Sequence, residues 1–572
     1  IVAGVSILTA AAESPRRWIA PSQPLRAMPV LSRVNNLRCR TLATLALAMA
    51  VSRGAAAQAR AFVAPDSPIY GDIDRLAASG LIDTIVIGTR PYTEREIVRL
   101  LSEAKRNLDR RTGGTEWAAR AIAAGLRRYD RTAPGAVQTV SLDLTSLDSP
   151  YRAIPADENG SIDATINPLA SYQAGRPHVN GTTSTLETTA SLSLGRHIAV
   201  SLQPRMAFGM PRSTAGDATL RVQSGNIVGA FGNLVVDVGR SYVGFSQSYP
   251  SGLLLSANSP PLDMVRISTE RPAALPWLFR YLGPMYGTLF VADLGRSYQT
   301  HPHAKLAGYH VSILPHPYVE LGAEVIDETG GNGAPPGTFT DRVIDLFPVF
   351  DLPLFEMLYR GYGNLRFSNK LVGMDGRIRV PSVAGMEVYA EVAVDDADIR
   401  RLRSTLLEDG GVIGGVAWSC MIECGRLVAR LEYHQTGIRY YTHTDFSSGV
   451  QQQGNLLGDP LGPRGLGGYA TLDAEGGRFG RVKVSAAHEV RSGNLYRSTA
   501  SDSTLSDFHF EQIVHRPGEH RTRVGVEWRT GLVDSRWSTT IGFGAERVRN
   551  ADFVADHRRL NSMARVSIEW RP

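Results

Sequence analysis

The chain has 572 residues, of which 43% are apolar and 20% are charged, and its 57 glycines form no collagen-like repeat. This composition is typical of a folded protein and excludes fibrous and low-complexity chains. No run of eighteen apolar residues follows residue 60, which argues against a membrane protein built from helices. The length fits either several domains or one closed β-barrel, because a closed sheet can grow without a larger solid core.

Residues 1–57 show the features of a secretory signal peptide. The apolar stretch 41–52 follows two arginines and precedes an Ala-x-Ala cleavage motif. We therefore predict cleavage before Gln58. A membrane-anchoring helix is the alternative, although twelve residues are too few to span a bilayer. The upstream extension is doubtful, because residues 1–27 are unlike the start of a signal peptide and Met28 is a candidate start of translation.

The net charge of +6 comes from this same segment. Seven arginines and one glutamate lie in residues 1–57, so the 61 basic and 55 acidic residues of the chain become 54 and 54 without them. Binding to nucleic acid requires a net basic surface or a concentrated basic patch. We therefore predict no nucleic-acid partner.

Residues 58–132 are predicted to form a small helical region. Pro68 suits the first position of a helix that Gly80 can end. Thr93 and Glu96 form a capping box ahead of a second apolar-periodic run. A third helix is expected over residues 116–129.

From about residue 136 the hydrophobic period changes from 3.6 to 2. In RVKVSAAHEV, for example, Val482, Val484 and Ala486 alternate with polar residues. We count about eighteen such runs, many of them nine to eleven residues long, which is the length that a tilted strand needs to cross a bilayer. GRLVARLEYHQ, EVYAEVAVDD and TRVGVEWRT repeat the pattern.

The last such run is RVSIEWRP, at the end of the chain. Val566, Ile568 and Trp570 fall on one face of this predicted strand, and Arg565 and Glu569 fall on the other. The strands of a soluble β-sandwich also alternate in this way, so one strand alone cannot show whether its outer face meets water or lipid. We predict that the apolar face lies against lipid and that the charged face lines a lumen.

The combined pattern predicts an all-β fold. A signal peptide, many strands of spanning length and an aromatic residue near the end of the chain together favour a transmembrane outer-membrane β-barrel of about 18 antiparallel strands over residues 133–572. Such barrels usually carry a C-terminal aromatic signal for the barrel assembly machinery, and Trp570 is the candidate.

Cys420 and Cys424 are the two cysteines after the predicted cleavage site. An exported compartment permits disulfides, and the spacing of these two suits a pair across a tight turn. Two thiols without a histidine cluster fall short of a zinc site. We predict a disulfide here.

The sequence contains no catalytic motif in its required context. GYGNLR at 361–366 lacks the third glycine of a dinucleotide-binding turn, and there is no nucleophile elbow or P-loop. His301 and His303 are too few ligands for a metal site, and DDAD at 395–398 is typical of a solvated strand end. We predict a protein that is not an enzyme and that binds no cofactor or metal. A hydrolase with serine and histidine on neighbouring strands stays an alternative.

The segment GIRYYTHTDFSSG, residues 437–449, is the strongest candidate for a binding surface. Sugar recognition needs ring faces and planar hydrogen-bonding groups, and this predicted strand end and outer loop supplies both. An aromatic belt at the membrane interface would have the same composition, so both interpretations stay open. The candidate residues are Arg439, Tyr440, Tyr441, His443, Asp445 and Phe446.

Several segments from about residue 66 to the end resemble, in order, the Wzi-like capsule assembly proteins. They are SPIYGDIDRLAASGLIDT, RPYTEREIVRLL, GLLLSANSPPLDMVRI, KLAGYHVSILPHPYVELGAEV, NKLVGMDGRIRVP with EVYAEVAVDDAD, and RYYTHTDFSSGVQQQGNLLGDPLGP. The resemblance implies an outer-membrane barrel of eighteen strands with a periplasmic helical bundle, acting as a lectin that helps to hold capsular or other surface polysaccharide on the cell.

The resemblance also assigns individual positions. The family's leucine-serine-asparagine segment, its tyrosine-histidine-glycine loop and the turn after that loop are matched by Leu254, Ser256, Asn258, Pro260, Tyr441, His443, Gly449, Gly458 and Pro460. One departure is the stretch VGFSQSYPSG, which lacks the tryptophan-glycine-proline order of many family members.

We therefore expect a monomeric outer-membrane protein whose partners are surface polysaccharide, membrane lipid and, during biogenesis, the barrel assembly machinery. The predicted polysaccharide-binding residues are Arg439, Tyr440, Tyr441, His443 and Asn258. The alternative is a pore for small solutes, with a lumen lined by Arg426, Arg430, Glu432, Arg481 and Lys483. An open lumen would favour the pore, and a lumen filled by loops or helices would favour the lectin.

Overall fold

The structure of the chain is a computed structural model. It describes residues 59–111, 116–130, 136–155, 162–336, 367–395, 406–420, 426–500, 508–531 and 535–572. The predicted signal peptide, the GYGNLR stretch, Cys424, most of DDAD and the predicted boundary at residue 133 lie outside these residues.

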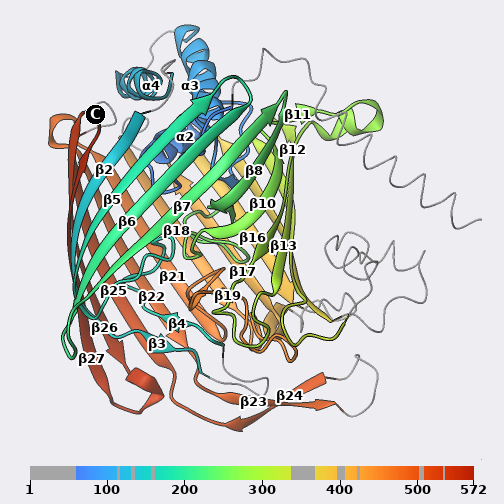
Figure 1. Ribbon diagram of the computed structural model, residues 1–572, viewed down its shortest axis with the longest axis vertical. Helices are drawn as coiled ribbons and strands as arrows, with labels where there is room; N and C mark the ends of the chain where they lie inside the picture. Colours follow the sequence, from blue (N-terminus) through green and yellow to red (C-terminus); the bar gives the residue numbers. More distant parts are fainter. Residues whose placement is uncertain are drawn as a thin grey trace, which may run out of the picture. The chain divides into compact units, whose positions relative to one another are not determined.

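Within the described ranges, eighteen antiparallel strands close into one barrel (Figure 1). Each strand pairs with the barrel strand next to it in the sequence, and the last strand, β27, pairs with the first, β2. Closure leaves the sheet without a free edge. The barrel strands are β2 (Ala136–Asp148), β5 (Gly181–Leu194), β6 (Ile198–Pro211), β7 (Asp217–Phe231), β8 (Leu234–Ser241), β10 (Leu262–Thr269), β12 (Pro284–Asp293), β13 (Lys305–His316), β14 (Val319–Thr329), β15 (Ser368–Val380), β16 (Met386–Asp395), β17 (Gly410–Trp418), β18 (Leu427–Thr436), β21 (Gly465–Glu475), β22 (Arg481–Arg491), β25 (Glu519–Thr530), β26 (Trp537–Arg549) and β27 (Arg558–Trp570).

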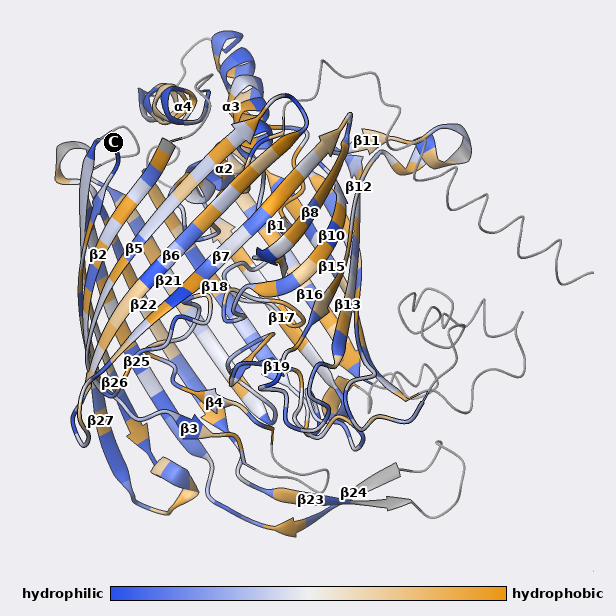
Figure 2. Ribbon diagram, viewed as in Figure 1, coloured by the Kyte–Doolittle hydropathy of each residue, from blue (hydrophilic) through white to orange (hydrophobic). Residues whose placement is uncertain are grey.

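The alternation predicted for the last strand is present in the barrel wall. Val566 and Ile568 are each 41% exposed on the outer face of β27. On the inner face, Arg565 Nη2 lies 2.8 Å from Asp143 Oδ1, and Glu569 pairs with Arg529 at 2.9 Å. Figure 2 shows the same alternation of apolar and polar residues along neighbouring strands. This part of the barrel wall therefore has an apolar outer face and a charged inner face.

The two ends of the barrel differ. Strand β2 begins and β27 ends beside the helices, at what we call the helix end (Figure 1). The opposite end, the loop end, carries the longer connections 149–180 and 437–464. The loop end also carries the hairpin of β23 (Leu495–Ala500) and β24 (Phe508–Val514). Cys420, in the β17–β18 connection at the helix end, is disulfide-bonded, and its predicted pairing with Cys424 stays a prediction.

In the described residues, three helices precede the barrel: α2 (Ile69–Ala78), α3 (Glu94–Asp109) and α4 (Glu116–Tyr129). The N-cap half of the predicted capping box is present, because the Thr93 hydroxyl accepts a hydrogen bond from the Glu96 N–H at the start of α3, whereas the Glu96 carboxylate accepts from Arg99. Trp117 of α4 donates to the Glu475 carboxylate in the barrel wall at 2.9 Å. No helix in the described part of the chain is long and apolar enough to cross a membrane.

Three segments fill much of the lumen, and we call residues 84–93, 242–261 and 437–464 together the plug. Two of them pair as short strands, β1 (Thr89–Arg90) with β9 (Gly244–Phe245). The plug and the neighbouring wall form one apolar core, which includes Phe245, Leu254, Phe290, Tyr440, Tyr441, Phe446 and Leu457. The remaining short elements are β3 (Arg152–Ala153), β4 (Thr165–Ile166), β11 (Ala273–Ala274), β19 (Gln451–Gln452), β20 (Asn455–Leu456), η1 (Trp277–Leu282), η4 (Gly477–Phe479) and η6 (Ala551–Phe553).

A polar cavity of about 830 Å³ occupies another part of the lumen, next to β2, β5, β6 and β25–β27. Lys483, one of the predicted lumen residues, lines it. Charged side chains of both signs surround it, among them Arg176, Glu187, Arg205, Glu527 and Arg565. The lumen is therefore part apolar core and part polar cavity.

The outer face gives a first testable prediction. Val524, near the middle of β25, is 58% exposed on that face. We expect Val524→Arg to lower the free energy of unfolding in phospholipid bilayers by about 2–4 kcal/mol, because the charge would enter the apolar band. Urea unfolding of the bilayer-inserted protein measures this. Thr540→Arg, at a position that lines the polar cavity, is the matched control, and equal losses for both variants would contradict the prediction.

Candidate functional site

The segments that carry the family resemblance meet inside the plug. The Ser256 hydroxyl donates to the carbonyl oxygen of Gly458 at 2.6 Å, and the Ser256 N–H donates to Leu457 O at 2.8 Å. The Asn258 side-chain amide donates to Leu456 O, also at 2.8 Å. Two segments that are about 200 residues apart are thus one structural unit. Asn258 is half-buried in this unit.

Tyr440 and Tyr441 lie in the core of the plug, where both side chains are 0% exposed. The Tyr441 hydroxyl donates to Leu253 O at 2.6 Å and accepts from the Asp459 N–H at 2.7 Å. Burial raises the pKa of the Tyr441 hydroxyl well above its usual range, which keeps it protonated as a donor. The prediction that these two tyrosines belong to an exposed outer surface is wrong, because their loop folds into the lumen.

The Tyr441 contact leaves no room for a larger residue at position 458. A Cβ atom added to Gly458 would lie 2.1 Å from Leu253 O and 2.3 Å from the Tyr441 hydroxyl. Tyr441 itself has a φ of 72°, in the left-handed region that side chains rarely adopt. Gly458 and Tyr441, which both match positions of the family, therefore hold the 437–464 loop in one conformation.

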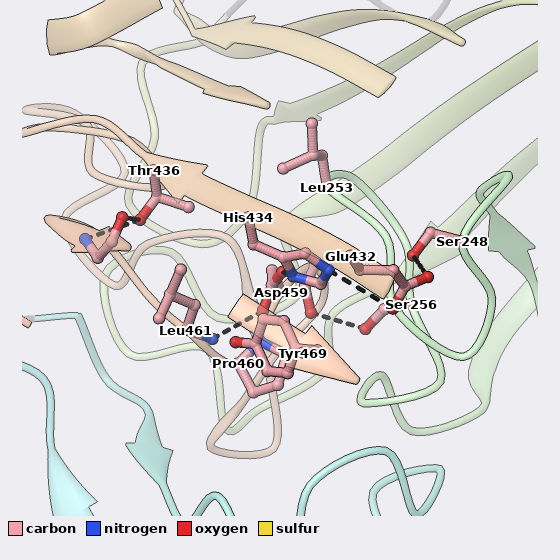
Figure 3. A network of polar contacts seen from close by, with 12 residues as sticks. Ser248, Leu253, Ser256, Glu432, His434, Thr436, Asp459, Pro460, Leu461 and Tyr469 are labelled. Carbon is pink, nitrogen blue, oxygen red and sulfur yellow. Dashed lines mark hydrogen bonds and ion pairs between the residues drawn. The ribbon is translucent and has the colours of Figure 1, made fainter. Parts of the chain in front are cut away.

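A polar network joins the plug to the wall strand β18 (Figure 3). His434 Nδ1 lies 2.6 Å from Asp459 Oδ2, and the ring packs on Tyr469 at 4.3 Å between centroids. Glu432 Oε1 accepts from the Ser248 hydroxyl at 3.0 Å and from the Tyr389 hydroxyl. Glu432 faces the lumen as predicted, but there it binds the plug.

A group of rings lies nearer the solvent, and we call His301, Phe367, His443 and Phe446 the loop-end cluster. The His301 ring lies 5.1 Å from Phe367 and 5.4 Å from Phe446, and Phe367 lies 5.3 Å from Phe446. His301, Phe367 and His443 are half-buried, whereas Phe446 is fully buried beneath them. The cluster places three half-buried rings beside the exposed Asp445.

The contacts around this cluster come from three loops. His301 Nε2 lies 3.1 Å from the carbonyl oxygen of Asp445, which joins the 294–304 and 437–464 connections. Arg439, predicted for the same surface, is half-buried and pairs with Asp409 at 2.7 Å. Sequence reasoning missed His301 and Phe367 as ring partners, because it weighed His301 only as a metal ligand and their loops are far apart in the sequence.

A family model described as capsule assembly protein Wzi matches residues 162–562. The chain belongs to this family. The predicted resemblance to the Wzi family is thereby confirmed, as are the outer-membrane location and the closed barrel of about eighteen strands. No curated protein sequence matches the chain.

Among solved structures, one Wzi structure shares this fold, and two other outer-membrane proteins are less similar. Wzi of Escherichia coli, described as an outer membrane protein involved in group 1 capsule assembly and as a carbohydrate-binding β-barrel, has a TM-score of 0.61 at 16% identity, over 88% of this chain and 98% of that chain. The outer membrane protein OprD of Pseudomonas aeruginosa has a TM-score of 0.37 at 10% identity, over 77% and 95% of the two chains. OccAB1 of Acinetobacter baumannii has a TM-score of 0.40 at 8% identity, over 76% of this chain and 95% of that chain.

The Tyr441 contact gives a second prediction. Tyr441→Phe removes a hydroxyl that both donates to Leu253 O and accepts from Asp459 N–H, so the buried N–H loses its partner and the buried carbonyl keeps only the longer contact with the Tyr440 hydroxyl. We expect the free energy of unfolding to fall by about 1–3 kcal/mol, measured by denaturant titration in detergent. Tyr440→Phe is the control: it loses one longer hydrogen bond, from the Tyr440 hydroxyl to Leu253 O at 3.3 Å, and should lower the free energy of unfolding by less. Equal stability of Tyr441→Phe and the unchanged protein would contradict this role.

Proposed function

We propose that this Wzi-family protein binds capsular or another extracellular polysaccharide at its loop end and helps to assemble or anchor it on the cell surface. The observation that carries the proposal is the loop-end cluster, where half-buried rings lie beside exposed polar groups above a filled lumen. The relation to a Wzi structure described as a carbohydrate-binding β-barrel supports it. In the same proposal the protein acts as a monomer, and the assembly machinery recognises the β27 strand during biogenesis.

The chemistry of the cluster suits a sugar polymer. A pyranose ring presents a C–H face that packs on Phe367 or on a histidine ring, and its hydroxyls can bond to the Asp445 carboxylate. Each contact of this kind is weak. A long polymer offers many copies of the same unit, so retention on the cell follows from many simultaneous contacts with many proteins.

The residues of the predicted set have different parts in this proposal. His443 belongs to the cluster and contacts the polymer directly. Tyr440 and Tyr441 act as positioning residues, because they hold the 437–464 loop against Leu253 from below. Direct contacts by Arg439 and Asn258 stay predictions.

The protein is proposed to be a binding protein and not an enzyme. A serine, a histidine and an aspartate do converge in the wall, where His310 Nε2 lies 2.9 Å from Asp375 Oδ2 and Nδ1 lies 3.4 Å from the Ser312 hydroxyl. However, Ser312 and His310 are both 0% exposed, and the Thr89 hydroxyl is closer to Nδ1, at 2.6 Å. A substrate carbonyl therefore cannot reach this serine.

The pore for small solutes is the second candidate function. The polar cavity of about 830 Å³ is the observation that favours it, because charged side chains line it on several strands. The plug favours the lectin, since it fills much of the lumen with an apolar core. Single-channel conductance in planar bilayers distinguishes the two, and we expect no stable open channel from the unchanged protein.

The main test is a pull-down of the host's own purified surface polysaccharide with folded, detergent-solubilised protein. We expect retention by the unchanged protein and about tenfold weaker retention by the double variant Phe367→Ala/His443→Ala, which removes two ring contacts. Trp277→Ala is the matched control, because Trp277 is an aromatic residue with 84% exposure in the connection between β11 and β12, away from the loop-end cluster.

Two results would count against the proposal. If folded protein retained no polysaccharide, the lectin function would be rejected for this chain. If the double variant and Trp277→Ala retained as much as the unchanged protein, binding would have to lie elsewhere than in the loop-end cluster.

A further inference from the structure

Three adjacent wall strands bring a histidine and two carboxylates together inside the barrel. His310 of β13 pairs across the sheet with Glu324 of β14, and Asp375 lies on the next strand, β15. One ligand atom from each side chain lies within 4.8 Å of the other two, and the three residues are 0%, 1% and 7% exposed. We call this group the three-strand cluster. The sequence predicted no metal site, since these residues are far apart along the chain and form no motif.

Glu324 lacks a compensating partner in this cluster. Neither of its carboxylate oxygens forms a hydrogen bond with any described residue, although both are buried. An ionised carboxylate in such a place is costly without a cation beside it. The guanidinium of Arg377 is already engaged, because it donates to Gln247 and lies 3.2 Å from Glu387. With Glu324 and Asp375 both ionised, the cluster would carry more negative charge than the neighbouring described side chains neutralise, which favours a bound cation.

Two glycines make room for the carboxylates to converge. Gly322 lies opposite Asp375 in the sheet, and Gly373 lies opposite Glu324. A Cβ atom at Gly322 would be 2.2 Å from Asp375 Oδ2, and one at Gly373 would be 2.7 Å from Glu324 Oε1. Each carboxylate thus occupies space above the glycine of a neighbouring strand that any larger residue at that position would fill.

The donor set suits a particular class of ion. One imidazole nitrogen and two carboxylates are ligands for first-row divalent ions such as Zn²⁺, which binds nitrogen and oxygen at about 2.0–2.2 Å and accepts water as a fourth ligand. The second nitrogen of His310, Nδ1, lies 2.6 Å from the Thr89 hydroxyl, and Asp375 Oδ1 accepts from the Gln247 side-chain amide at 2.6 Å. These outer contacts orient the ring and the carboxylate.

We propose that His310, Glu324 and Asp375 bind one divalent first-row transition-metal ion between the barrel wall and the plug. The ion would separate His310 Nε2 from Asp375 Oδ2 and bind both, and it would neutralise Glu324. Because Thr89 and Gln247 belong to two different plug segments, the ion also fixes the plug to strands β13–β15. Its role is to stabilise the filled state of the lumen.

The test uses the full-length folded protein without an affinity tag, stripped with a chelator and then dialysed against Zn²⁺. We expect one zinc per chain by elemental mass spectrometry and a higher Tm with zinc than without it, because the ion binds only the folded state. In Glu324→Gln we expect zinc affinity to fall at least tenfold and the zinc-dependent rise in Tm to disappear.

Glu328→Gln is the matched control. Glu328 is a buried carboxylate on the same strand, about 13 Å further along it, and outside the three-strand cluster. This variant should keep the zinc and the rise in Tm. Folded protein that binds no zinc, or equal zinc binding by Glu324→Gln and the unchanged protein, would overturn the proposal. Parallel dialysis against Ca²⁺ should load no ion, because calcium prefers sites made entirely of oxygen ligands.

Discussion

A closed barrel of eighteen strands encloses a lumen that is too wide for wall side chains to fill, and the rest of this structure depends on that constraint. Segments of the chain must enter the lumen, and their backbone N–H groups then need partners away from water. Wall carboxylates supply them. Glu320 accepts from the N–H groups of Ile87 and Gly88 at 2.8 and 2.9 Å, and Glu391 accepts from those of Ser248 and Leu253. Carboxylates on the inner face of the barrel thus bind backbone N–H groups of the plug.

The same docking determines what the loop end presents to the outside. The 437–464 loop is anchored from below by the Tyr441 hydroxyl and by the close approach of Gly458 to Leu253. This anchorage leaves Phe446 buried, with the half-buried rings of His443 and His301 each packed against it. Because the 437–464 loop is already held in place, the loop-end cluster would lose little conformational freedom when a polymer binds to it.

The sequence predicted the barrel well, since period-two alternation is a local property that every strand carries. The N-cap at Thr93 and the inward direction of Glu432 followed from the same kind of local pattern. The burial of Tyr440 and Tyr441 could not be predicted, because a loop rich in tyrosine and polar residues has the same composition on a rim and in a plug. His310 and Asp375 are 65 residues apart, and only the register of three strands makes them neighbours.

The pairing of β2 with β27 has a consequence for how the protein is made. Val140 lies opposite Trp570, so the sheet closes only through contacts between residues that are hundreds of positions apart. Such long-range pairing is slow, because a large chain entropy is lost before the contacts form. Until β27 arrives, both edges of the sheet expose unpaired backbone groups that another chain could add to. A frameshift or early stop before Arg558 would therefore yield a chain that aggregates and is degraded, instead of a slightly smaller barrel.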